Sequence, residues 1–305
     1  MPKVLHRLCG REMLAYVLDA CRKAGVAKMY VVVGYGADQV RKRFGGADDI
    51  VWVVQDEQKG TAHAVMCCKE LLKDFAGQTY VLCGDVPFVE ADVLKKLAEK
   101  HDAEGCSMTL ATTMLDDPSG YGRIIRDASG DPAGIVEHND CTDEQLGIRE
   151  VNPSYYLFDN KALFDALEQV RPDNVKNEYY LTDVLSIILD SGGKVSAVAA
   201  VQPEGALGVN SQLGLSEASR IMQQRIQAEL MAGGVTIVDP ASTWIDVRAE
   251  IGADTVIEPF TYIGGAAKIG CGCRIGPLAY LSETVVLEDG SSAGPGTGLA
   301  RAGND

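Results

Sequence analysis

Aliphatic residues recur at every sixth position near the end of the chain. Eight consecutive sites keep this spacing without a slip: Ile245, Ile251, Ile257, Ile263, Ile269, Ile275, Leu281 and Leu287. Glycine directly follows four of them, at Gly252, Gly264, Gly270 and Gly276. A six-residue repeat of this kind is typical of a parallel β-helix, in which each aliphatic side chain points into a triangular core. A chance run of isoleucines in a glycine-rich loop would not keep the spacing over eight steps. At about 18 residues per coil, the repeat predicts fewer than three coils.

The sequence before the repeat has a different periodicity. Between residues 11 and 200, short apolar segments alternate with segments of helical spacing; the former are 29–34, 50–54, 79–83 and 107–111, and the latter 14–21, 37–44, 61–72 and 91–100. Apolar strands with little polar alternation, separated by helices, indicate βαβ units and a mostly parallel sheet. The pattern therefore predicts an α/β fold for this part of the chain.

These two periodicities divide the chain into regions. We expect an α/β domain over residues 1–210, a connecting helix over 211–232 and a partial β-helix over 233–288. Residues 289–305 lose the six-residue repeat and are rich in glycine, serine and proline, so we expect a disordered tail there.

Charge and cysteine content exclude several classes of protein. Among 305 residues, 28 Lys and Arg face 43 Asp and Glu, a formal net charge of −15, whereas nucleic-acid binding favours a basic surface. The nine cysteines form no Cys-x-x-Cys and only four histidines are present, which argues against a zinc cluster and fits free thiols in a reducing cytoplasm. No apolar run has the length of a signal-peptide core or a membrane span, so we expect a cytoplasmic protein without a membrane span.

Polar residues follow two of the expected strands. Ligands of open α/β sheets bind beyond the carboxyl ends of the strands, and Gly84 and Asp85 close one such strand. Asp85 could meet a nucleotide-bound magnesium ion there, although an aspartate at this position is also a common turn or cap residue. After the preceding strand, Gln55 could pair bidentately with the edge of a base, and Gly60 would let the backbone approach closely. Thr61 can equally be a helix cap, and His63, one turn inside the helix, is expected to be packed.

Other polar residues lie beside apolar segments further along the chain. Gly122 stands in the glycine-flanked turn Gly120-Tyr121-Gly122-Arg123-Ile124, and Glu137, Asn152 and Asn210 each adjoin an apolar segment. Each of these alone is compatible with a surface or turn position. No Ser-His-Asp triad is suggested by the sequence.

Taken together, these segments resemble one family: the bacterial bifunctional N-acetylglucosamine-1-phosphate uridyltransferase / glucosamine-1-phosphate acetyltransferases. The resemblance covers residues 1 to about 285, and its motifs are Pro2-Lys3-Val4-Leu5-His6, Gln55 with Gly60-Thr61-Ala62-His63-Ala64, Gly84-Asp85-Val86-Pro87, Gly120-Tyr121-Gly122-Arg123-Ile124, Gly134-Ile135-Val136-Glu137-His138, Glu178-Tyr179-Tyr180-Leu181-Thr182-Asp183, Gly208-Val209-Asn210 and the hexads. It implies a Rossmann-like, GT-A-like nucleotidyltransferase domain followed by a short, truncated left-handed parallel β-helix.

The resemblance also implies an activity and roles for particular residues. UTP and N-acetylglucosamine 1-phosphate would give UDP-N-acetylglucosamine, a precursor for peptidoglycan and lipopolysaccharide, and pyrophosphate. Asp85 and Asn210 match the Mg²⁺-binding pair, and Lys3 matches a phosphate-contacting lysine. Gln55 and Gly60 match the uracil-reading positions, with Thr61 beside them, and Gly84 is a further substrate-binding position. The residues that match sugar and ribose contacts are Gly122, Glu137 and Asn152, with Tyr180 and Thr182 as further candidates near the sugar.

The chain departs from the family pattern at both ends. The family places a strand and a glycine-rich phosphate loop ahead of the Pro2-Lys3 pair; their absence here would leave two neighbouring strands with unpaired edges. No histidine follows His138, so the histidine base of the acetyltransferase half is absent.

Three functions therefore stay open. The first is the uridylyltransferase, with UTP and N-acetylglucosamine 1-phosphate as partners, which we expect to be active only with the N-terminal strand and loop restored. The second is a nucleotidyltransferase for another sugar 1-phosphate. The third is an inactive chain that binds ligand or forms a homotrimer through the β-helix.

Overall fold

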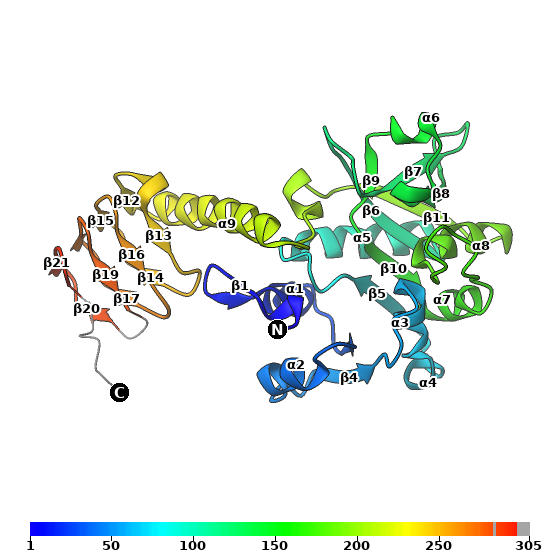
Figure 1. Ribbon diagram of the computed structural model, residues 1–305, viewed down its shortest axis with the longest axis horizontal. Helices are drawn as coiled ribbons and strands as arrows, with labels where there is room; N and C mark the ends of the chain where they lie inside the picture. The colour runs from blue at the N-terminus through cyan, green and yellow to red at the C-terminus, as the bar shows by residue number, and fades with distance from the viewer. Residues whose placement is uncertain (283–284, 298–305) are drawn as a thin grey trace. The chain divides into compact units, whose positions relative to one another are not determined.

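The computed structural model describes residues 1–282 and 285–297, which form two compact units (Figure 1). The first unit comprises Met1–Leu5 and Met13–Gly208, and the second comprises His6–Glu12 and Val209–Asp305. The boundary after Gly208 lies within two residues of the expected end of the α/β domain. Residues 6–12, in contrast, belong to the second unit and not to the first.

The first unit consists of alternating helices and strands, as expected. Its helices are α1 (Met13–Lys23), α2 (Ala37–Phe44), α3 (Thr61–Met66), α4 (Lys69–Leu72), α5 (Ala91–Glu104), α6 (Asp143–Leu146), α7 (Asn160–Leu167) and α8 (Val184–Asp190). Its strands are β3 (Met29–Val33), β4 (Ile50–Val54), β5 (Gln78–Leu82), β6 (Met108–Met114), β7 (Gly122–Arg126), β8 (Pro132–Val136), β9 (Glu150–Asn152), β10 (Tyr155–Asp159) and β11 (Val195–Ala199). The single helix expected over residues 61–72 is interrupted at Cys67 and Cys68.

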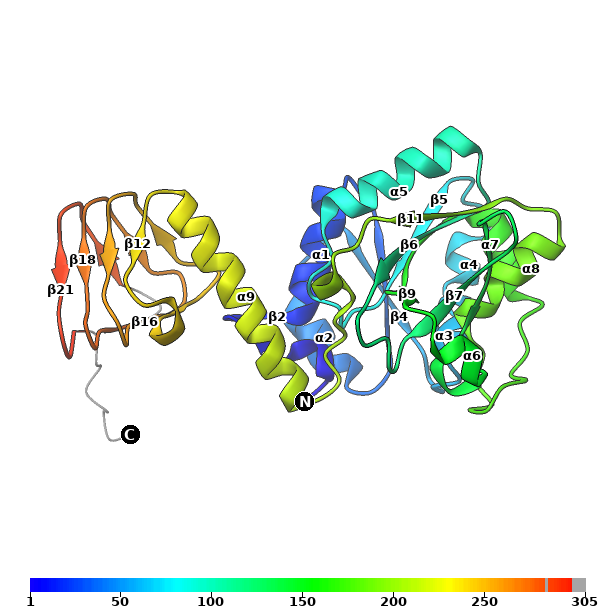
Figure 2. The same ribbon diagram turned by 90° about the horizontal axis from the view of Figure 1, so that it is seen from above.

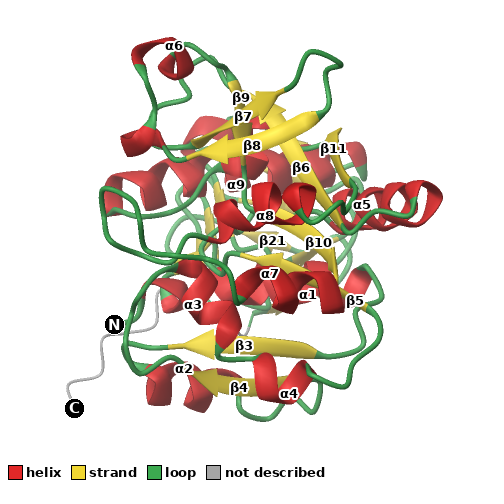
Figure 3. Ribbon diagram, turned by 90° about the vertical axis from the view of Figure 1, so that its right-hand side faces the viewer, coloured by secondary structure: helices red, strands yellow, loops and turns green. Residues whose placement is uncertain are grey.

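The main sheet is mixed, and the expectation of a mostly parallel sheet was wrong. Its strand order is β5-β10-β6-β9-β7-β8, with β11 paired to β6. Strand β10 lies antiparallel between β5 and β6, and β7, β8 and β9 also pair antiparallel. Only β11 and β6, and the separate pair β3 and β4, are parallel (Figure 3). Strands β5 and β6 still run in the same direction, since both are antiparallel to β10.

Two hydrophobic cores lie on opposite faces of this sheet. Tyr155 and Leu157 of β10 join a core formed with α1, α2 and α5, whereas Tyr156 and Phe158 join a core formed with α3, α4, α7 and α8 (Figure 2). Alternate side chains of a strand point to opposite faces, so one continuous apolar strand can serve both cores. The first unit is therefore a three-layer arrangement of helices, sheet and helices.

A cavity of about 950 Å³ separates β3 from β5. Every residue of both strands lines it, together with apolar side chains of α1 such as Leu14 and Leu18. Within the described residues, β3 pairs only with β4, and β5 pairs only with β10. Each strand thus has one edge without a strand partner, which agrees with the expectation drawn from the family resemblance.

The second unit begins with a hairpin and a long helix and continues as a parallel β-helix. Its elements are β1 (Arg7–Leu8), β2 (Arg11–Glu12), α9 (Gln212–Ala232), β12 (Thr236–Ile237), β13 (Trp244–Ile245), β14 (Glu250–Ile251), β15 (Val256–Ile257), β16 (Tyr262–Ile263), β17 (Lys268–Ile269), β18 (Arg274–Ile275), β19 (Tyr280–Leu281), β20 (Val286–Leu287) and β21 (Ser292–Ala293). Three parallel sheets form its faces, in the orders β12-β15-β18-β21, β13-β16-β19 and β14-β17-β20. Of the helices in the described residues, none has an apolar stretch long enough to cross a membrane.

The six-residue repeat builds the core of this β-helix. Six of the eight repeat residues are at most 4% exposed, and only Ile251 and Leu287 are partly exposed. Gly270 has to lack a side chain, because a Cβ atom there would lie 2.6 Å from the backbone nitrogen of Asp289 in the next coil. The prediction of a hexad β-helix is therefore confirmed.

The expectation of disorder was wrong for residues 289–297. Strand β21 in this segment pairs with β18, and Ala293 is 1% exposed. Ala293 stands six positions after Leu287, so the repeat continues there with a smaller side chain. Residues 298–305, the rest of the expected tail, lie outside the described residues.

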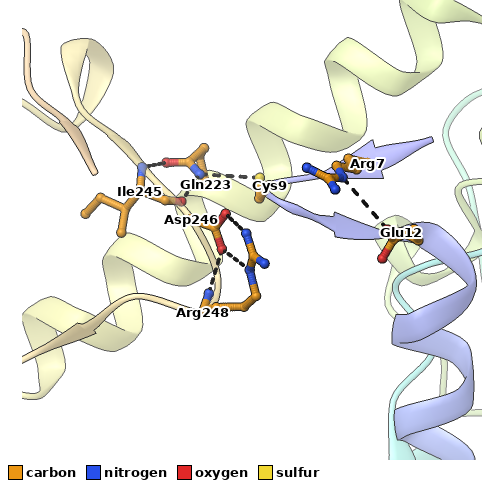
Figure 4. A network of polar contacts seen from close by, with 7 residues as sticks. All are labelled: Arg7, Cys9, Glu12, Gln223, Ile245, Asp246 and Arg248. Carbon is orange, nitrogen blue, oxygen red and sulfur yellow. Dashed lines mark hydrogen bonds and ion pairs between the residues drawn. The ribbon is translucent and has the colours of Figure 1, made fainter. Parts of the chain in front are cut away.

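Gln223 of α9 joins the N-terminal hairpin to the β-helix inside the second unit (Figure 4). Its amide accepts a hydrogen bond from the Ile245 nitrogen at 2.9 Å, and its nitrogen lies 3.3 Å from the Cys9 sulfur. Gly10, at φ +94°, packs directly against Asp246, which is itself paired with Arg248 at 2.7 Å. These contacts explain why residues 6–12 fold with the second unit.

The backbone amides of Tyr30 and Val32 should exchange with deuterium faster than the amide of Val31. Met29 donates to Asp49 and Gln55 donates to Val33, so alternate residues 29, 31 and 33 pair with β4 while Tyr30 and Val32 face the cavity. Hydrogen exchange followed by NMR should give a difference of at least about tenfold. Equal protection of the three amides would mean that another segment pairs with this edge, and would contradict the account.

Candidate active site

The carboxyl end of β5 carries an ion pair. Asp85 follows Gly84 just beyond this strand, and its Oδ2 accepts a hydrogen bond from the Lys3 ammonium group. Lys3 begins a short 3-10 helix, Lys3–Leu5, and its side chain is 43% exposed, against 20% for Asp85. A cation and a carboxylate that both remain open to ligand are suited to bind a phosphate and a metal ion, respectively.

The neighbouring thiol is not a nucleophile. Burial raises the pKa of Cys83 to about 11, and the negative charge of Asp85 adds to the increase. Cys83 is therefore protonated at neutral pH, and a thiol in that state is a poor nucleophile.

A second group of expected residues lies where β4 leads into α3. The Gln55 side-chain nitrogen is 3.3 Å from the Gly60 carbonyl oxygen and 3.0 Å from Nδ1 of His63. Gly60 has φ +112°, and a Cβ there would lie 2.4 Å from the Tyr179 carbonyl oxygen. The Thr61 hydroxyl accepts from the Leu181 nitrogen at 3.0 Å, so it ties α3 to the segment after Tyr179.

A third group is brought together by strand pairing and a side-chain hydrogen bond. Gly122 of β7 is opposite Asn152 of β9, and a Cβ on Gly122 would lie 3.7 Å from Glu137 Oε2 and 3.0 Å from Ile135. Thr182 donates its hydroxyl to Glu137 at 3.1 Å. Gly122 is buried, and the absence of a side chain there lets β7 pack closely against Ile135 beside the Glu137 carboxylate.

Burial and neighbouring negative charge raise the pKa values of the acids in this third group. The pKa of Glu137 is raised, first by burial, although the hydrogen bond from Thr182 opposes the increase. Burial also raises the pKa of Asp183, helped by the charge of Glu137, and it raises the pKa of Tyr180 to about 12. Tyr180 is therefore a phenol that can donate a hydrogen bond at neutral pH.

These groups share the polar end of the cavity between β3 and β5. Thr61, Gly84, Glu137 and Thr182 all line it, one or more from each group, whereas most of the remaining lining is apolar. Asn210, the expected partner of Asp85 at a metal ion, belongs to the second unit, so their pairing stays a prediction. The cavity is thus lined by four of the candidate residues of the first unit, whereas Lys3, Gln55, Gly60, Asp85, Gly122, Asn152 and Tyr180 are not part of its lining.

The donor atoms of the site fit a nucleotide-bound Mg²⁺ ion better than a metal ion whose ligands all come from the protein. Across residues 1–282 and 285–297, no three His, Cys, Asp or Glu side chains gather closely enough to hold a metal ion. Mg²⁺ on a nucleotide is bound by one or two carboxylate or carbonyl groups, with phosphates and water completing its octahedron. Asp85 and an amide oxygen match that donor set.

Sequence reasoning missed three residues of the site. Tyr156 is buried and receives a hydrogen bond from the Asn152 side-chain nitrogen at 2.6 Å, which fixes that amide. Arg123 is 1% exposed, donates to the Tyr121 carbonyl oxygen, and lies 3.4 Å from Nδ1 of His138. His63 contacts Gln55. In the sequence, Tyr156 and Arg123 each place a polar group beside apolar residues of a strand, and this pattern could have identified them.

Comparison with known proteins identifies the family to which the chain belongs. The nucleotidyl transferase family matches residues 1–247, and the chain belongs to this family. A solved structure described as UDP-glucose pyrophosphorylase complexed with UDP-glucose has the same fold, with a TM-score of 0.60 over 74% of this chain and 91% of that chain, at 17% identity.

The curated relatives give a more particular relationship. The chain is 46% identical over 263 residues to the bifunctional protein GlmU of Listeria monocytogenes and of Geobacillus thermodenitrificans, and 45% identical over 261 residues to that of Pelotomaculum thermopropionicum. Each alignment covers 86% of this chain and 57% of the relative. The chain is a homologue of the GlmU proteins and spans little more than half of their length.

Replacing Thr182 by valine should raise the pKa of Glu137 further. The Thr182 hydroxyl hydrogen bond is the leading influence that lowers this pKa, and valine removes it with little change in volume. NMR titration of the Glu137 side-chain carboxyl carbon would measure the change. Thr182→Ser, which keeps the hydroxyl, is the control and should titrate like the parent protein; an unchanged pKa in Thr182→Val would contradict the assignment.

Proposed function

We propose that the first unit transfers the uridylyl group of UTP to N-acetylglucosamine 1-phosphate, giving UDP-N-acetylglucosamine and releasing pyrophosphate. The observation that carries the proposal is the Lys3–Asp85 ion pair beyond the carboxyl end of β5, in a chain that belongs to the nucleotidyl transferase family. The product would serve cell-wall precursor synthesis in the cytoplasm, where UTP is available.

The reaction needs charge compensation more than a protein nucleophile. A phosphate oxygen of the sugar phosphate attacks the α-phosphorus of UTP in line, while the bond from that phosphorus to the bridging oxygen of the β-phosphate breaks and pyrophosphate leaves. Lys3 would offset the negative charge that grows on the phosphates. Mg²⁺ bound at Asp85 and Asn210 would supply further charge neutralisation. The protonated Cys83 has no covalent part in this scheme.

The other two groups of the site would hold the two ends of the product. Gln55, Gly60 and Thr61 would bind the uracil, and the Gln55 side-chain nitrogen lies 3.3 Å from the Gly60 carbonyl oxygen, so the first two of these residues are adjacent. Glu137, Asn152, Gly122, Tyr180 and Thr182 would bind ribose and sugar hydroxyls. A raised pKa at Glu137 and Tyr180 leaves this group with both donors and acceptors, which suits neutral hydroxyl groups.

The direct test is Mg²⁺-dependent pyrophosphate release by the 305-residue chain, with UTP and N-acetylglucosamine 1-phosphate. A panel that includes dTTP and glucose 1-phosphate separates the uridylyltransferase from a nucleotidyltransferase for another sugar phosphate. Release that prefers glucose 1-phosphate with dTTP would favour the second function. No release and no UTP binding by a stable oligomer would favour the inactive chain.

Asp85→Asn and Lys3→Gln should each reduce kcat by about 100-fold or more, because each removes a charge that acts on the phosphates. Pyrophosphate release under saturating UTP and sugar phosphate would measure the loss. Lys96→Gln, at an exposed position of α5, is the matched control and should leave kcat unchanged. Activity retained in Asp85→Asn would rule out the proposed role of the ion pair.

We also propose that the β-helix associates with further copies of itself, as a homotrimer. Phe260 and Leu278 are 66% and 61% exposed at equivalent positions of successive coils. Beside them, Tyr262 and Tyr280 stack with ring centroids 4.9 Å apart and are also exposed. A column of apolar side chains on a regular surface marks a protein interface.

The double variant Phe260→Glu, Leu278→Glu should be monomeric where the parent chain is trimeric. Carboxylates in these two positions would oppose burial of the column. Multi-angle light scattering gives the mass, and Lys268→Glu on another face serves as the control. A parent chain that is monomeric at every concentration would contradict the proposal.

A further inference from the structure

The Gln55 side-chain amide is held between two fixed acceptors. Its nitrogen lies 3.3 Å from the Gly60 carbonyl oxygen and 3.0 Å from His63 Nδ1. The Gln55 backbone is anchored as well, because its N–H donates to the Val33 carbonyl oxygen at 2.9 Å. The amide therefore has little freedom to rotate while both contacts are present.

These contacts determine which end of the amide faces a ligand. A carbonyl oxygen can only accept, so the Gln55 group next to Gly60 has to be the NH₂. The same NH₂ then donates its second hydrogen to His63 Nδ1, and the imidazole carries its own hydrogen on Nε2. Gln55 Oε1 is left as the free acceptor of this amide. An amide turned the other way would set two acceptors against one another at Gly60.

The two acceptors are themselves fixed by the backbone of Tyr179. Its nitrogen donates to Lys59 at 2.8 Å, and its carbonyl accepts from Ala62 at 2.9 Å, one residue before His63. The aromatic ring of Tyr179 lies 6.4 Å from that of His63. The backbone at Lys59 and at Ala62 is thus hydrogen-bonded to a second segment, which holds the residue next to His63 in place.

We propose that His63 is a positioning residue that sets nucleotide specificity by fixing the orientation of the Gln55 amide. With Oε1 presented, Gln55 accepts a hydrogen bond from the imide N–H of a uracil or thymine ring. Cytosine carries an unprotonated acceptor nitrogen at that ring position, and the two acceptors repel each other. The inference rests on the proposed function, which places the uracil at Gln55 and Gly60, and it adds the means by which uridine and cytidine nucleotides are distinguished.

The test uses two substitutions of the imidazole. His63→Phe keeps a ring of similar size but removes one of the two acceptors, so the Gln55 amide is held only by its 3.3 Å contact with the Gly60 carbonyl oxygen and turns more easily to present its NH₂ to cytosine. His63→Asn can place Oδ1 where Nδ1 was and keeps the acceptor. Cys67→Ala is the matched control on the same helical face, since its thiol donates a hydrogen bond to the His63 carbonyl oxygen and its side chain packs against the hydrophobic core.

The readout is the ratio of kcat/KM for UTP to that for CTP, together with binding of the two nucleotides by calorimetry. His63→Phe should lower the UTP preference by about 10-fold, mainly through KM, as expected for loss of one hydrogen bond's discrimination. His63→Asn should stay within about threefold of the parent ratio, and Cys67→Ala should match the parent. A merely structural role of His63 would lower both values of kcat/KM and leave their ratio unchanged.

The outcomes separate this inference from the proposed function. If the parent chain prefers UTP and His63→Phe keeps that preference, or if His63→Asn loses it as fully as His63→Phe, the inference is wrong and the proposed function stands. If the parent chain neither binds nor uses uridine nucleotides in preference to cytidine nucleotides, the proposed function fails, and the inference fails with it.

Discussion

Strand β10 is the element on which both cores of the first unit depend. Its side chains alternate between the two faces of the sheet, and Leu157 and Phe158 are completely buried on opposite sides. A strand that is apolar on both faces can sit only in the middle of a sheet, between helical layers. The segment that precedes it carries Asn152, so packing of β10 also fixes one part of the candidate site. Tyr156 makes this link directly, since its ring is in the core and its hydroxyl holds the Asn152 amide.

The proposed site would bind phosphates with few positive charges, in a chain whose formal net charge is −15. Lys3 is paired with Asp85, and burial, with the negative charge of neighbouring acids adding to it, raises the pKa values of Glu137 and Asp183. Under the proposed function, phosphate would be bound through Lys3 and a bound metal ion, and not through a broad basic surface. The phosphates would then lie at the charged pair beyond β5, and the sugar at the group around Glu137, where Tyr180 and Thr182 supply hydroxyl groups.

The sequence predicted the elements that follow from a short repeat of apolar residues, but it did not predict the strand directions and contacts that depend on segments far apart in the chain. The β-helix coils follow from apolar residues at every sixth position, the helices from a period of about 3.6 residues and the strands from short apolar runs. All three patterns can be read directly from the sequence. The direction of β10 depends on how its segment returns to the sheet, and nothing in residues 155–159 encodes that. The hairpin at residues 6–12 joins the second unit through Gln223, more than two hundred positions away. Ala293 was overlooked because its small side chain hides a continuing repeat.

The same contrast applies to the site. The sequence proposes Asp85, Gln55 and Gly60 as site residues because ligands often bind at strand ends and glycine turns, and their roles stay predictions, whereas His63 was expected to be packed. Its contact with Gln55 spans the turn into α3 and becomes visible only once the Tyr179 segment closes that loop. A crystal structure with UDP-N-acetylglucosamine and Mg²⁺ tests the central claim most directly. The account predicts uracil against Gln55 and Gly60, with the sugar against Glu137 and Asn152. Ligand bound elsewhere, or uracil beside Glu137, would contradict it.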